Sequence, residues 1–153
     1  MTRIMKERWD ANKDKLRAIL AERTDLNSCE YKDLVRLTFE TIYNDSESDH
    51  QTLNLKNITV IDDGDYQGTL LFIIPFKTYQ PCEYDYIMTY IGYGSCSGCD
   101  ALQGVQAWHH EAQKLTEKQV SGFMDICCDL ICNAIKPYNY AWREDANWLP
   151  AEE

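Results

Sequence analysis

Apolar residues recur at helical spacing through the first 44 residues, which predicts two amphipathic helices. The first predicted helix spans about residues 3–22, and its apolar face consists of Trp9, Leu16, Ile19 and Leu20. The second runs from about Glu30 to Tyr43, with Asn27 or Ser28 as its expected N-terminal cap. Its apolar face consists of Tyr31, Leu34, Val35, Thr38, Phe39 and Ile42. Because a short polar segment joins them, we expect an antiparallel helical hairpin over residues 3–44.

The apolar pattern changes to that of strands between residues 57 and 93. Residues 58–60 and 69–76 read as two strands joined through an acidic segment, with Asp63-Gly64 as the expected turn. Residues 83–93 alternate in polarity and form the third predicted strand. The run from Leu70 to Phe76 is continuously apolar, so we expect it to be the central strand and to be covered on both faces. A three-stranded antiparallel meander follows.

Helical spacing returns after a glycine-rich segment. Residues 101–114 are helix-like over part of their length, although Gly104 weakens the pattern. Thr116 and Gln119 form a capping-box signature at the start of the strongest predicted helix, which extends to about Ile135. Its core face consists of Val120, Phe123, Met124, Cys127, Leu130, Ile131 and Ala134.

These elements predict one α+β domain over residues 1–153, a three-stranded antiparallel sheet packed with about four helices. Its parts are a helical hairpin (3–44), a β-meander (57–93), a helical part (97–136) and an aromatic tail (137–153). The tail contains Tyr140, Trp142 and Trp148, and we expect it to dock on the domain or on a partner.

The chain is strongly acidic, with a formal net charge of −10. Such a surface repels phosphate backbones, so direct nucleic-acid binding is disfavoured and a basic partner protein is favoured. Solubility alone is the other interpretation of the charge. The candidate partner-binding residues are Asp45, Glu47, Asp49, Asp62, Asp63 and Asp65.

No membrane or export segment is recognisable. The longest apolar run, residues 70–74, is far too short to cross a bilayer, and residues 1–20 lack the apolar block of a signal peptide. We therefore expect a cytoplasmic protein with reduced cysteines and no membrane association.

The glycine-rich segment between the third strand and the next helix is the first candidate site. Its backbone and hydroxyl donors could form a nest for an anion such as a nucleotide phosphate. The candidate ligand-binding residues are Gly92, Gly94, Ser95, Ser97 and Gly98. The segment lacks the lysine of a P-loop, and a tight turn that brings the chain close to its neighbours explains the glycines equally well.

The seven cysteines offer a second candidate site. Cys96 and Cys99 have the spacing of half a tetrahedral zinc site, and Cys128 and Cys132, one turn apart on a helix, could supply the other half. Small, half-buried side chains are the alternative interpretation. A thioredoxin-like redox function is disfavoured because two helices and a meander, rather than a βαβ unit, precede the Cys-x-x-Cys pair. His109 and His110 form no recognisable catalytic set, so the sequence favours a binding protein over an enzyme.

Residues 63–71 and 90–103, including Gly-Tyr-Gly-Ser-Cys-Ser-Gly-Cys-Asp at 92–100, resemble a group of small bacteriophage-encoded proteins without an assigned activity. The resemblance covers about residues 54–145. It implies a phage accessory protein made in the cytoplasm of an infected bacterium. By analogy, such a protein would be a non-enzymatic binder or inhibitor of a host defence or nucleic-acid-handling protein, acting through an acidic, tyrosine-rich surface. The alternatives are a small-ligand binder that uses residues 92–98 and a zinc-stapled domain.

Overall fold

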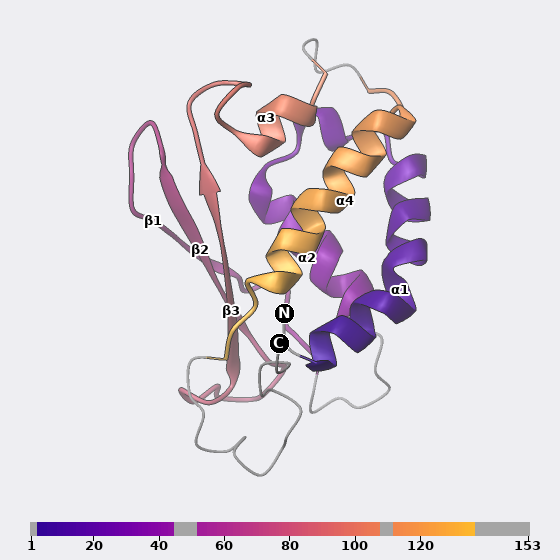
Figure 1. Ribbon diagram of the computed structural model, residues 1–153. Coiled ribbons are helices and arrows are strands. Elements are labelled where there is room, and N and C mark those ends of the chain that lie inside the picture. The colour runs from indigo at the N-terminus through magenta and orange to yellow at the C-terminus, as the bar shows by residue number, and fades with distance from the viewer. Residues whose placement is uncertain (1–2, 45–51, 108–111, 137–153) are drawn as a thin grey trace.

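The computed structural model describes residues 3–44, 52–107 and 112–136. Its helices are α1 (Arg3–Glu22), the short 3₁₀ helix η1 (Leu26–Ser28), α2 (Tyr31–Ile42), α3 (Ala101–Val105) and α4 (Glu117–Cys132). Its strands are β1 (Thr59–Asp62), β2 (Gly68–Pro75) and β3 (Tyr86–Tyr93). Figure 1 shows the helices gathered on one side of the sheet, with α1 farthest from it. The fold is α+β, as the sequence predicts.

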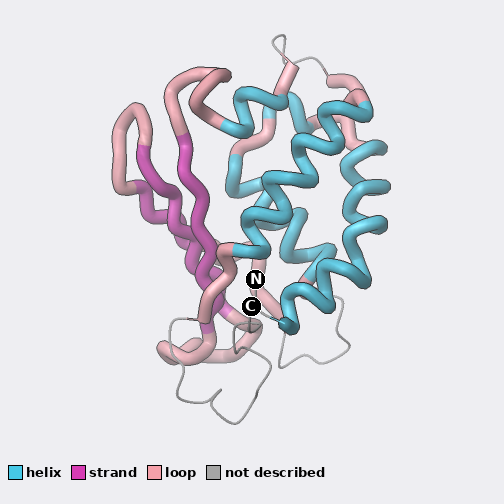
Figure 2. Tube along the Cα trace, viewed as in Figure 1, coloured by secondary structure: helices cyan, strands magenta, loops and turns pink. Residues whose placement is uncertain are grey.

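The three strands form an antiparallel meander in the order β1-β2-β3, which confirms the predicted topology. Thr59 of β1 pairs with Ile73 of β2, and Gly68 at the start of β2 pairs with Tyr93 at the end of β3. The β1–β2 turn and the segment that leads from β3 to α3 therefore lie at the same end of the sheet (Figure 2). Beyond α4, Ile135 makes a single bridge to Met88 of β3.

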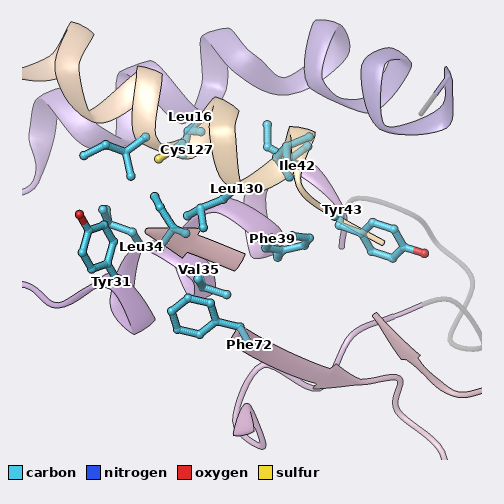
Figure 3. Packing of buried hydrophobic residues seen from close by; sticks show 14 of the residues in the cluster. Leu16, Tyr31, Leu34, Val35, Phe39, Ile42, Tyr43, Phe72, Cys127 and Leu130 are labelled. Carbon is cyan, nitrogen blue, oxygen red and sulfur yellow. The ribbon is translucent and has the colours of Figure 1, made fainter. Parts of the chain in front are cut away.

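The core lies between the sheet and helices α2 and α4 and continues between these helices and α1 (Figure 3). Helix α4 contacts β3 and the other three α-helices, so it occupies the centre of the packing. Phe39, Phe72 and Phe123 are fully buried and come from α2, β2 and α4. Every position predicted for the apolar faces of α2 and α4 is buried, including Cys127. Periodicity located these faces because both helices bury a single continuous stripe.

The start of α2 differs from the prediction. Glu30 is the N-cap, and it forms a reciprocal capping box with Asp33. Asn27 and Ser28 instead lie in η1, where the Asn27 side-chain oxygen accepts hydrogen bonds from Ala107 N–H (2.9 Å) and Gln119 Nε2 (3.0 Å). Asn27 thus joins three segments that are distant in sequence. A local cap pattern could not reveal this role, because Asn is as good an acceptor in tertiary contacts as at a helix end.

Helix α3 covers Ala101–Val105, which is part of the helix-like segment 101–114, as predicted. Helix α4 is shorter than predicted, because it ends at Cys132 rather than near Ile135. The capping box of Thr116 and Gln119 is present as predicted. The predicted aromatic tail (137–153), together with His109 and His110, lies outside the described residues.

Contrary to the prediction, the described helices cover only one face of the central strand β2. Phe72 and Ile74 on its inner face are completely buried beneath the helices, whereas Leu71 and Ile73 on its outer face are only half-buried. Edge strand β1 is exposed along its whole length. A strand with apolar residues on both faces has the same sequence pattern whether one or both of its faces are covered. The described helices cover one face only. No described helix is both long and apolar enough to traverse a bilayer.

Candidate functional site

Two glycine-containing turns meet at one end of the sheet, and both belong to the segments singled out by the sequence. In the β1–β2 turn, one carboxylate oxygen of Asp62 accepts hydrogen bonds from Gly64 N–H (3.0 Å) and from the Tyr93 hydroxyl (2.6 Å). Asp63 accepts a hydrogen bond from Thr69 N–H (2.6 Å). Asp62 and Asp63 therefore organise the turn itself, and the hydroxyl of Tyr93 ties it to the end of β3.

The β3–α3 turn is held by a carboxylate that the sequence analysis did not select. Asp100 is buried, with 4% of its surface exposed. It accepts hydrogen bonds from Gly94 N–H (3.0 Å), from Gln103 N–H (2.9 Å) and from the Tyr31 hydroxyl of α2 (3.1 Å). The same Tyr31 hydroxyl accepts a hydrogen bond from Leu102 N–H (3.1 Å). Asp100 thus caps α3 and joins it to the turn and to α2.

This arrangement changes the interpretation of the predicted anion nest. The one buried backbone donor of the glycine segment, Gly94 N–H, already binds a carboxylate of the chain itself. Gly94 is also the glycine that the turn requires, because a Cβ atom there would lie 2.5 Å from the Cys99 carbonyl oxygen. Gly98 has open space around it, and Ser95 and Ser97 are exposed. The tight-turn interpretation of the glycines therefore has direct structural support.

The four cysteines proposed as zinc ligands do not come together. Cys96 and Cys99 are exposed in the β3–α3 turn, whereas Cys128 is half-buried and Cys132 exposed on α4. Among the described residues, no three His, Cys, Asp or Glu side chains form a group that could hold a metal ion. The sequence spacing was suitable for metal binding within each cysteine pair, but it could not show whether the two pairs lie close together in the fold.

The thiols differ in acidity. Hydrogen bonding from the Cys96 thiol, and secondarily from its backbone, holds the pKa of Cys99 below its usual value. Burial raises the pKa of Cys29 and of Cys127 to about 12, and burial followed by the neighbouring Cys132 raises that of Cys128 to about 11. A thiolate is the reactive form of cysteine, so Cys99 is favoured over these three as a nucleophile.

The acidic residues selected as a partner-binding surface are only partly described. Asp62, Asp63 and Asp65 are all exposed in the β1–β2 turn, next to Tyr66, whose surface is 82% exposed. Asp45, Glu47 and Asp49 lie outside the described residues. The acidic turn thus combines carboxylates with an exposed aromatic ring.

The outer face of the sheet continues from this acidic turn. We call it the open face and define it by five residues from three strands: Ile61, Leu71, Ile73, Met88 and Tyr90. Ile61 pairs with Leu71, which pairs with Tyr90, and Ile73 pairs with Met88, so their side chains share one side of the sheet. Ile61 is 48% exposed and Tyr90 42% exposed. The sequence pattern identified Leu71, Ile73, Met88 and Tyr90 as strand residues, whereas Ile61 lies just beyond the predicted first strand. The pattern could not show that these five residues share one face of the sheet.

A cleft of about 500 Å³ lies on the opposite side of the sheet, beside the β3–α3 turn. Val60, Leu70 and Phe72 contribute apolar surface from the strands, and the start of α2 and the whole of the Asp100 network form the other walls. Its ionisable lining groups are Glu30, Lys32, Tyr31, Asp62, Tyr93, Asp100 and Cys29. Three carboxylates against one ammonium group make the cleft unfavourable for a phosphate and more suitable for a neutral or positively charged ligand.

Comparison with known proteins does not add to this geometry: no family model, no curated protein and no solved structure matches the chain.

Proposed function

We propose that this protein is a non-enzymatic phage accessory protein that binds a basic surface of a bacterial host protein and thereby inhibits it. The open face and the adjacent acidic turn would form the binding surface. The observation that carries the proposal is the exposure of Ile61 of β1 and Tyr90 of β3 on the side of the sheet away from the described helices, where Leu71 and Ile73 of β2 lie half-buried between them.

The composition of this surface fits a protein interface. Protein interfaces have an apolar, often aromatic centre and a polar rim, and contiguous exposed apolar patches mark interaction sites. Here Ile61 and Tyr90 supply the exposed centre, and the β1–β2 turn supplies a carboxylate rim with Tyr66.

Charge specifies the kind of partner. The net charge of −10 and the acidic turn attract lysine- and arginine-rich surfaces. Such surfaces are typical of proteins that hold phosphate backbones. The resemblance of residues 54–145 to phage proteins makes a bacterial protein that handles nucleic acid, including a defence protein, the proposed target.

The test compares three variants as bait in a lysate of the bacterial host, followed by affinity measurement with the purified partner. Ile61→Asp alters the centre and Asp65→Lys alters the rim. Asp65 is chosen because Asp62 and Asp63 hold the turn together. Asp14→Lys, on the exposed surface of α1, is the control with the same change of charge as Asp65→Lys. We expect Ile61→Asp and Asp65→Lys each to weaken binding at least about tenfold, and Asp14→Lys to leave it within about twofold.

Equal binding by all four proteins would overturn the proposal. So would a stable homodimer that Ile61→Asp dissociates in light scattering, because a second copy would then occupy the open face.

The cleft supports a second candidate function, the binding of a small ligand beside the glycine segment. Its acidic lining favours an amine or a neutral ligand over the nucleotide or other anion that the sequence suggested. Calorimetric titration with spermidine and with ATP distinguishes the two chemistries, and we expect heat of binding with spermidine only.

Neighbouring residues of β1 provide matched variants for the two surfaces. Val60, 38% exposed, lines the cleft, whereas Ile61 belongs to the open face. Val60→Trp should abolish spermidine binding and leave partner capture intact, whereas Ile61→Trp should leave spermidine binding intact. Binding of ATP but not spermidine, or loss of spermidine binding in both variants, would contradict this assignment.

A further inference from the structure

The hydrogen bonds of the β3–α3 turn bring Cys96 and Cys99 together. Cys99 N–H donates to the Cys96 carbonyl oxygen (3.1 Å), which closes a four-residue turn, and Asp100 N–H donates to the same oxygen (2.8 Å). The end residues of a β-turn have their Cα atoms within about 7 Å, and a disulfide requires about 4.4–6.8 Å. The backbone therefore holds the two cysteines at a distance that a disulfide can span.

The Cys99 side chain folds back over Cys96. Its sulfur lies 3.0 Å from the Cys96 backbone nitrogen, from which it accepts a hydrogen bond, and 3.3 Å from the Cys96 carbonyl oxygen. Both cysteines are exposed, so a small reagent in solution can reach them. Gly94 leaves room for the Cys99 thiol. A Cβ atom at position 94 would lie 2.8 Å from the Cys99 sulfur, which is too close for a normal contact.

The other cysteines lack this combination. Cys128 and Cys132 are four residues apart on α4, where Cβ atoms are about 5–6 Å apart, beyond the roughly 3.5–4.5 Å of a disulfide. Cys127 is buried, Cys29 is half-buried, and Cys82 lies in the loop at the other end of the sheet.

We propose that Cys96 and Cys99 form a reversible dithiol–disulfide couple that reacts with low-molecular-weight disulfides such as glutathione disulfide. The Cys99 thiolate attacks one sulfur of glutathione disulfide, forms a mixed disulfide and expels one glutathione thiolate. Cys96 loses its proton to solvent and attacks the Cys99 sulfur, which forms the Cys96–Cys99 bond and expels the second glutathione thiolate. Two protein thiols are oxidised, and one glutathione disulfide is reduced to two glutathione thiols after both take up protons.

Formation of this bond would change the segment that supports the cleft. The Cys99 sulfur would become a disulfide sulfur and a weaker acceptor for Cys96 N–H, and the turn beside Gly94 and Asp100 would become covalently closed. The couple does not depend on the open-face proposal, because it lies in a different turn and its test needs no partner.

The test treats fully reduced protein with glutathione disulfide at neutral pH and maps the products by mass spectrometry of non-reduced peptides. We expect an internal Cys96–Cys99 disulfide in the wild type, reversed by dithiothreitol. Cys96→Ser should stop at a glutathione adduct on Cys99, because the resolving thiol is absent. Cys128→Ser, the control from the second cysteine pair, should form the internal disulfide at the wild-type rate.

A second measurement does not require the variants. Alkylation of the reduced wild type by iodoacetamide should modify Cys99 at least about tenfold faster than Cys128. A stable glutathione adduct in the wild type, an internal disulfide at another pair, or equal alkylation of Cys99 and Cys128 would each overturn the proposal.

Discussion

The β1–β2 turn and the β3–α3 turn are built in the same way but lie in different surroundings. In each, a glycine passes so close to the backbone that a Cβ would clash, 2.0 Å from the Gln67 oxygen at Gly64 and 2.5 Å from the Cys99 oxygen at Gly94. In each, an aspartate accepts hydrogen bonds from at least one backbone N–H group and from one tyrosine hydroxyl. The aspartates of the first turn are exposed, whereas Asp100 is buried.

Burial decides what each turn can do. An exposed carboxylate exchanges its protein donors for water at little cost, so the first turn can present its charges to a partner. Two of the donors to Asp100, the Gly94 N–H and the Tyr31 hydroxyl, form buried hydrogen bonds, so losing the carboxylate leaves these two groups unsatisfied. The first turn is thus available for recognition, and the second holds α2, α3 and β3 together.

The largest difference is expected between the two aspartates. Asp100→Ala should lower the free energy of unfolding by about 3 kcal/mol, because it removes the acceptor of three buried or half-buried donors. Asp63→Ala, which removes one exposed acceptor, should lower it by about 1 kcal/mol or less. Urea denaturation measures both, and equal losses would show that burial does not separate the two turns.

The next largest effect on stability is expected for the glycines of the β3–α3 turn. Gly94→Ala should lower the free energy of unfolding by about 1–3 kcal/mol, because the added methyl group meets the backbone and the sulfur of Cys99. Gly98→Ala is the matched control, since nothing lies within 4 Å of its Cβ position, and its stability should be unchanged or slightly raised. Thermal unfolding followed by circular dichroism compares the two, and a destabilised Gly98→Ala would contradict this assignment of roles.

The smallest effect concerns the two tyrosines that donate to the aspartates. Tyr31→Phe should lower the free energy of unfolding by about 1–2 kcal/mol, because it breaks the link between Asp100 and Leu102 N–H. Tyr93→Phe should change the melting temperature only slightly, because its partner Asp62 is exposed. Comparable losses in both variants would remove the distinction between the turns.

The Tyr93 variant also tests the electrostatics of the exposed turn. The Tyr93 hydroxyl, followed by Gly64 N–H, lowers the pKa of Asp62 in the folded protein. A lowered pKa stabilises the fold above the ordinary carboxyl range, and this contribution is lost as the pH falls through the folded-state pKa. Tyr93→Phe should raise the pKa of Asp62 toward its ordinary value and reduce the loss of stability on acidification. Carbon-detected NMR titration of the carboxylates measures the shift, and an unchanged Asp62 would contradict it.

Much of the secondary structure could be predicted from the sequence because it depends on local patterns. The buried faces of α2 and α4 follow from residues three and four positions apart, and the Thr116–Gln119 capping box is contained within four residues. The meander follows from alternation and from the short connections between β1, β2 and β3.

The candidate site depended on contacts that no local pattern contains. Tyr31 and Asp100 are 69 residues apart, and their hydrogen bond forms only because the fold brings the first residue of α2 next to the start of α3. The cysteines show the same limit. The sequence gives the spacing of Cys96 and Cys99, but the packing of the β3–α3 turn and α4 determines that this pair lies apart from Cys128 and Cys132.

The sequence by itself determined the order and approximate position of the main helices and strands and that the domain is acidic, because periodicity, capping and charge are properties of neighbouring residues. Only the tertiary structure decided that the helices cover one face of the sheet and that Asp100 occupies the glycine turn. Both features depend on contacts between segments that are distant in the sequence. The burial of apolar surface and the hydrogen bonds between those segments determine which contacts form.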